Sequence, residues 1–110
     1  MGYRSTIVIG IDKQVLARDL LTKEIPDCLK RESKYIDEDA GIVYWRLEDW
    51  KWYPDYKDIQ AIEHWFDDIL DGEEFGAMRL GEEQTDIETW GDPYKFGIEL
   101  NQHIDSPIPY

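Results

Sequence analysis

Carboxylates are the side chains in this sequence whose number and spacing could do chemistry. One group lies in or just after a segment that we expect to be a helix, residues 55–71: Asp58, Glu63, Asp67, Asp68, Asp71, Glu73 and Glu74. The last of these lie at the negative end of the helix macrodipole, where each carboxylate costs a few tenths to about 1 kcal/mol. Such an arrangement suggests carboxylates displayed for a cationic partner, and a merely solvated acidic face is the alternative.

A second acidic group follows within a short stretch and consists of Glu82, Glu83, Asp86 and Glu88. A calcium-binding loop needs an oxygen ligand at its fifth position and a glutamate at its twelfth. Counted from Asp86, these positions are Trp90 and Gly97, so the calcium pattern fails. We therefore expect a secondary acidic patch here and no metal site.

Nucleophiles and metal-binding pairs are sparse in the chain. His64 and Asp68 lie one helical turn apart, but no second histidine or cysteine lies nearby to complete a metal site. Cys28 is the only cysteine, and Lys30 and Arg31 give it only a weakly electropositive setting. The sequence has no glycine-rich phosphate loop and no nucleophile elbow. We expect a protein that is not an enzyme, with no catalytic residue, cofactor or metal.

Aromatic residues offer a different kind of site. Trp50, Trp52 and Tyr53 fall in an expected loop before Pro54. Tryptophan and tyrosine are over-represented as binding anchors, although a loop tryptophan can equally close the end of a small core. Stacking on nucleic-acid bases normally requires a basic groove, and the neighbouring residues here are acidic.

The charge is distributed unevenly along the 110 residues, whose formal net charge is −13. Residues 1–34 have seven basic and five acidic side chains, whereas residues 35–110 have five basic and twenty acidic ones. This balance favours a basic partner and is poorly suited to naked nucleic acid or an anionic membrane. Because the apolar run at residues 7–11 is too short for a signal segment or a membrane span, we expect a cytoplasmic protein.

The spacing of apolar residues predicts one domain, residues 1–105, followed by an extended tail, residues 106–110. The first half should contain a strand at 6–11, a helix capped by Asp12 and ended by Pro26, and a hairpin of 34–36 with a central strand at 42–47. The second half should contain a helix at 55–71 with Asp55 and Asp58 as its capping pair, a hairpin of 75–80 with 85–90, and a last strand at 94–100. These elements predict an α+β fold, a two-layer sandwich with two helices on one face of a largely antiparallel sheet. A ferredoxin-like core with an added hairpin is one version of it.

Several short motifs resemble a known group of proteins. They are the opening Met1–Ser5 before a strand, Tyr56–Phe66, Met78–Glu82 continuing through Asp86–Glu88, and the closing strand. In these motifs the chain resembles a family of small, uncharacterised proteins of phages and prophages. The resemblance implies a phage accessory protein that acts in the host cytoplasm. The segment 90–93 departs from the more acidic, glycine-rich stretch typical of the family.

Two classes of function remain open, besides a self-assembling structural protein. The first is an acidic inhibitor or adaptor that engages a basic, nucleic-acid-binding host protein by imitating a phosphate backbone. The resemblance makes a counter-defence role, such as an anti-CRISPR protein, part of this hypothesis. The second is a small-ligand or nucleotide-binding protein, a sequestering protein or enzyme, with a pocket between helices and sheet. Basic residues of the first third would then hold the phosphates: Arg4, Lys13, Arg18, Lys30 and Arg31.

Overall fold

The computed structural model describes residues 4–22, 25–83, 85–100 and 104–105. The expected tail at 106–110 lies outside these ranges. Within them, no helix has the length and apolar character that crossing a membrane requires.

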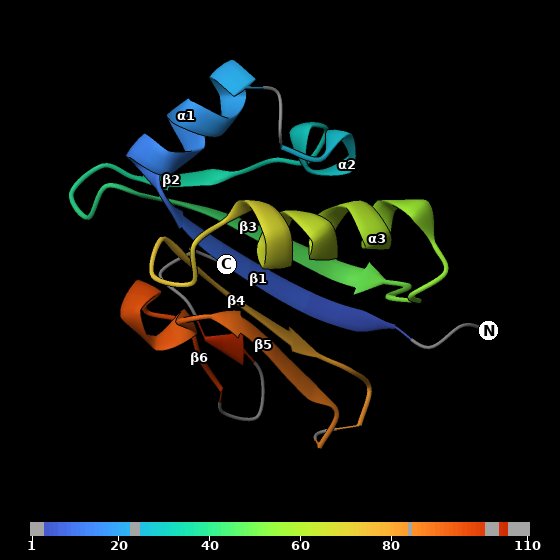
Figure 1. Ribbon diagram of the computed structural model, residues 1–110. Helices are drawn as coiled ribbons and strands as arrows, with labels where there is room; N and C mark the ends of the chain where they lie inside the picture. Colours follow the sequence, from blue (N-terminus) through green and yellow to red (C-terminus); the bar gives the residue numbers. More distant parts are fainter. Residues whose placement is uncertain (1–3, 23–24, 84, 101–103, 106–110) are drawn as a thin grey trace.

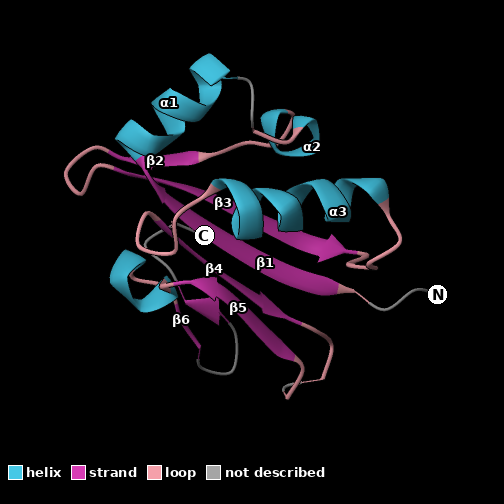
Figure 2. Cartoon of the chain, in the orientation of Figure 1, coloured by secondary structure: helices cyan, strands magenta, loops and turns pink. Residues whose placement is uncertain are grey.

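A five-stranded sheet forms the centre of the protein, in the order β2-β3-β1-β4-β5, with every pair of neighbouring strands antiparallel (Figures 1 and 2). The strands are β1 (Ser5–Asp12), β2 (Tyr35–Asp37), β3 (Ile42–Trp50), β4 (Phe75–Leu80) and β5 (Ile87–Gly91). The expected hairpins β2-β3 and β4-β5 are both present. Without β5, the chain order and the strand order are those of a ferredoxin-like βαββαβ unit. The predicted α+β fold is confirmed, with β5 as the added strand.

Helices cover one face of this sheet (Figure 2). They are α1 (Lys13–Thr22), α2 (Asp27–Lys30), α3 (Lys57–His64) and the π-helix η1 (Trp65–Ile69) that continues α3. The Asp12 side chain accepts a hydrogen bond from the backbone N of Gln14 at 2.8 Å, which confirms the expected cap. The described part of α1 ends at Thr22, before Pro26, and Pro26 is in turn the N-cap of α2, where its fixed φ suits the start of a helix.

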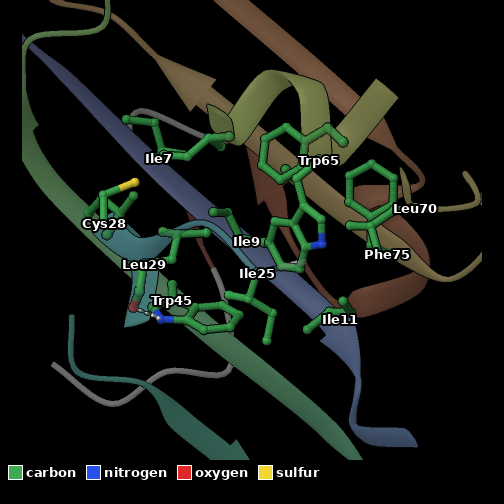
Figure 3. Close-up of a cluster of buried hydrophobic side chains, with 14 of the residues drawn as sticks. Ile7, Ile9, Ile11, Ile25, Cys28, Leu29, Trp45, Trp65, Leu70 and Phe75 are labelled. Carbon is green, nitrogen blue, oxygen red and sulfur yellow. Dashed lines mark hydrogen bonds between the residues drawn. The ribbon is translucent and has the colours of Figure 1, made fainter. Parts of the chain in front are cut away.

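The main core lies between this sheet face and the helices (Figure 3). Ile7, Ile9 and Ile11 lie at alternate positions of β1, and all three side chains are fully buried in this core. The ring of Trp45 is fixed within this core because its Nε1 donates a hydrogen bond to the backbone oxygen of Leu29 at 3.1 Å (Figure 3). Burial of large side chains of this kind contributes roughly 1.5–3 kcal/mol each and explains how so acidic a chain stays folded.

The opposite face of the sheet is also covered, at least in part. Val8, Tyr44 and Met78 form a second buried cluster with Phe96 and Ile98. Because both faces are covered, Tyr44 and Trp45 are both buried although they point in opposite directions. The two-layer prediction therefore needs an addition, a short C-terminal segment that packs beneath the sheet.

That C-terminal segment differs from its prediction as a single strand over 94–100. The 3-10 helix η2 (Pro93–Phe96) comes first, and β6 (Glu99–Leu100) then pairs with β7 (Ile104–Asp105). The alternating pattern was overridden by local signals: a proline at the first helical position, the Asp92 side chain accepting from the backbone N of Lys95 at 3.3 Å, and Gly97 at a φ of 74°. This turn brings Phe96 under the sheet.

Candidate functional site: an acidic surface centred on Glu63

The second helical segment begins and ends differently from its prediction as one α-helix over 55–71. The N-cap of α3 is Tyr56, with no side-chain hydrogen bond at the cap, so the expected capping pair was wrong. At its other end the backbone N of Leu70 donates to the oxygen of Trp65 at 2.9 Å, the five-residue step of a π-helix.

The π-helix determines which side chains of this segment face solvent. Its wider turn buries Trp65 and Phe66 together with Leu70, all at most 6% exposed. Asp67 and Asp68 then share the outer side and are both exposed. The π-helix thus places two adjacent carboxylates on the surface while their flanking residues anchor the segment in the core.

Glu63 lies at the centre of the acidic surface and is half-buried. Burial raises the pKa of its carboxyl above the usual 4.5, and the charges of Glu88 and Asp67 raise it further. A hydrogen bond from Trp52 and the charge of Arg79 oppose this rise in pKa. Glu88 belongs to β5 and Asp67 to the π-helix, so the two acidic groups, distant in sequence, meet at Glu63.

Arg79 of β4 connects this meeting point to the sheet. Its guanidinium Nη2 lies 2.8 Å from Oδ1 of Asp86 and 2.6 Å from Oε1 of Glu88, and its Nη1 donates to Ser5 Oγ at 2.9 Å. Burial opposes the charged form, but these hydrogen bonds and charges outweigh it and raise the pKa of Arg79. Arg79 is only 6% exposed, and its charge is neutralised by Asp86 and Glu88 of the same chain.

We call Glu63, Asp67, Asp86 and Glu88 the acidic junction. Arg79 pairs with Asp86 and Glu88, and the charges of Glu88 and Asp67 act on Glu63, so four carboxylates are balanced by one arginine and negative charge is in excess. Arg79 was not among the site residues predicted from the sequence. The available signal was a lone basic residue in an otherwise apolar strand, since a buried charge needs a partner and acidic residues follow in the next strand.

The other predicted acidic residues lie in α3, in the turn before β4 and in the β4-β5 hairpin. Asp58 is exposed at the other end of α3, with Arg31 at 4.0 Å. The turn before β4 contains the exposed Asp71 and Glu73, while Glu74 is half-buried and pairs with Arg18 at 3.2 Å. In the β4-β5 hairpin, Glu82 accepts from the backbone N of Arg4 at 3.0 Å and Glu83 is exposed.

The three aromatic residues predicted as binding anchors differ in position and in burial. Trp52 is 7% exposed and packs on Trp90 with ring centroids 5.8 Å apart, so it belongs to the core. Trp50 is the last residue of β3, not a loop residue, and is half-buried. Tyr53 is half-buried and makes an edge-to-face contact with Tyr56, with ring centroids 5.2 Å apart. Tyr56 is 43% exposed. The aromatic surface near the acidic residues is this tyrosine pair.

Cys28 was considered as a nucleophile, and His64 as a metal ligand. Cys28 is 5% exposed, and burial, assisted by the charge of Asp58, raises the pKa of its thiol above 9.0. His64 Nδ1 lies 2.7 Å from Asp68 Oδ2 on the surface. Among the described residues, no three His, Cys, Asp or Glu side chains are grouped so as to hold a metal ion.

Comparison of the chain with protein families, with curated proteins and with solved structures gave no match.

Proposed function

We propose that the protein is a non-enzymatic binding protein whose acidic surface engages a basic, nucleic-acid-binding protein. The observation that best supports this function is that Glu63 and Asp67 of the first acidic group lie close to Asp86 and Glu88 of the second. Charge scattered around the whole domain would serve solubility alone, whereas charge gathered on one surface attracts a cationic groove.

The surface would act by taking the place of phosphates. Carboxylates of the acidic junction, with Asp68 beside them, would pair with Arg and Lys side chains that otherwise hold a nucleic-acid backbone. Arg79 is buried and already pairs with Asp86 and Glu88, so Glu63, Asp67 and Asp68 would make the main contacts with the partner's cations. An approaching cation would favour the charged form of Glu63 and so lower the pKa of this carboxyl.

The resemblance to small phage and prophage proteins supports a biological setting for this activity. An acidic accessory protein of a phage would act in the host cytoplasm on a basic host protein. A CRISPR or restriction nuclease is the class of target that combines a nucleic-acid groove with a reason for a phage to block it.

The test is affinity capture from host lysate with two variants of equal charge change. Asp67 and Asp68 are replaced by lysine in the first variant, and Glu32 and Asp39, exposed residues near the β2-β3 side of the sheet, are replaced by lysine in the second. We expect the wild type and the second variant to retain one basic protein in low salt and to lose it in high salt.

The first variant should not capture that protein at all. The captured protein is then titrated with duplex DNA or RNA, which should compete with the wild-type chain for it. Equal capture by both variants, or capture unaffected by nucleic acid, would contradict the proposal.

A further inference from the structure

A cavity of about 220 Å³ opens where α1 and α2 meet the sheet, and no residue of the acidic junction is among the described residues that line it. The described residues that line it are Leu16, Ile25, Lys30, Lys34 and Trp45. In Figure 3, Ile25 and Trp45 lie near each other in the buried cluster. The cavity therefore has its inner end at the core and its mouth at the surface.

The inner lining is apolar. Trp45 is 2% exposed, and its one donor, Nε1, is already bound to the backbone oxygen of Leu29. Leu16 and Ile25 contribute aliphatic carbons and are buried. A ligand group inside would meet ring and alkyl surface, and a polar group placed there would lose its hydrogen bonds.

Both charged side chains among the described lining residues are lysines. Lys34 is exposed, and Lys30 lies 3.5 Å from the almost fully exposed Asp27, a weak and solvent-screened pairing. Both lysines belong to the sequence segment 1–34, which has seven basic and five acidic side chains. The mouth of the cavity is thus complementary to an anion in a protein that is otherwise strongly acidic.

The volume limits the size of the ligand. A dry cavity of roughly 150 Å³ holds benzene, and pockets for drug-sized ligands begin at roughly 300 Å³. A space of about 220 Å³ accommodates one ring or a short chain and is small for a whole nucleotide. The ligand is therefore smaller than the nucleotide considered from the sequence.

We propose that this cavity binds a small amphipathic carboxylate. Its ring or short alkyl chain contacts Trp45, Leu16 and Ile25, and its carboxylate lies at the mouth near Lys30 and Lys34. This site is separate from the acidic surface and goes beyond the proposed function, because it accepts an anion where the acidic surface accepts cations.

The probes are sodium benzoate and sodium octanoate, each compared with the neutral alcohol of the same carbon skeleton. Binding is measured by calorimetry and located through the NMR shift of the Trp45 indole N–H. We expect each carboxylate to bind more tightly than its alcohol. Lys34→Gln should weaken the carboxylate by about twofold to fivefold, the range of an exposed ion pair, and leave the alcohol unchanged.

Two further variants make the outcome decisive. Lys57→Gln removes an equivalent exposed lysine from α3, outside the cavity, and should change nothing. Leu16→Phe or Ile25→Phe fills the cavity and should abolish binding of all probes; the variant that keeps the wild-type circular dichroism is used. Absence of binding to both carboxylates, or binding that survives in the filled variant, overturns the proposal.

Discussion

The indole Nε1–H of Trp52 donates a hydrogen bond to Oε1 of Glu63 across 3.1 Å. Trp52 is a core residue that packs on Trp90 of β5, and Glu63 is the centre of the acidic junction. One carboxylate therefore both contributes surface charge and satisfies the donor of a buried ring. Binding and stability should be coupled at this position.

Glu63→Gln should stabilise the protein near neutral pH, because the glutamine oxygen keeps the hydrogen bond while the charge is removed. The pKa of Glu63 is raised in the folded state, so the folded protein binds the proton more tightly than the unfolded chain. Wild-type stability therefore falls as pH rises from the usual value of 4.5 through the higher folded pKa. Urea unfolding should give a higher midpoint for Glu63→Gln at about pH 7 and equal midpoints below about pH 4.

Asp67→Asn is the matched control, since Asp67 is exposed on the neighbouring turn. Its effect on the urea midpoint should be smaller at neutral pH than that of Glu63→Gln. A wild-type midpoint that exceeds that of Glu63→Gln at about pH 7 would show that the charged form of Glu63 stabilises the fold.

Asp86 and Glu88 should stabilise the fold in a non-additive way through Arg79. Asp86→Ala or Glu88→Ala alone should cost about 1–2 kcal/mol, less than a fully buried charged hydrogen bond, because both carboxylates are partly exposed. The double variant leaves a buried guanidinium without either carboxylate and should cost more than the sum. Urea unfolding measures all three, with the exposed Asp39→Ala as control. Strict additivity would mean that Arg79 finds other partners.

Gly76→Ala should be strongly destabilising, because β4 passes directly against the chain at Asp92 and Pro93. A Cβ added to Gly76 would lie 2.5 Å from the Asp92 backbone oxygen and 2.5 Å from Pro93 Cα, where only backbone movement relieves the clash. We expect a loss of about 3 kcal/mol, the upper end for overpacking. Gly72→Ala is the control: its Cβ would come no closer than 4.0 Å to its nearest neighbour, and thermal unfolding should change little.

Cys28 should react slowly with thiol reagents in the folded protein. Its side chain is buried, and its raised pKa reduces the thiolate fraction that attacks a disulfide reagent. At about pH 8, Cys28 of the folded protein should react with the disulfide reagent at a rate at least about tenfold below that of the protein unfolded in urea. Equal rates would show that α2 opens readily.

Elements with strong local patterns were predictable from the sequence. The strand at 75–80 was placed at its observed bounds because its apolar run ends at clear turn residues. The strand predicted over 94–100 was wrong because capping by Asp92 and the turn at Gly97 outweighed the alternation. The π-helix was also missed, since a one-residue widening of the turn depends on how Trp65 and Phe66 pack.

The candidate site was predictable residue by residue but not as an arrangement. Composition identified every carboxylate of the acidic junction, including Glu63 and Glu88. Their proximity depends on the helical segment of Glu63 and Asp67 packing against β5, where Phe66 contacts Trp90, and no local pattern specifies how a helix is placed over a sheet. The burial of Trp52 was undetermined for the same reason, because its contact with Trp90 joins segments that only the sheet brings together.

Strand β1 is synthesised first, yet both of its edges remain unpaired until much later parts of the chain have emerged. One edge pairs with β3 and the other with β4, where Thr6 meets Leu80. Such distant pairing makes folding slow, because loop closure precedes any gain from the contacts. Until β4 leaves the ribosome, the nascent protein presents an apolar strand with an open edge, the arrangement most prone to aggregation. The abundant negative charge of the later segments would then keep neighbouring nascent chains apart during this interval.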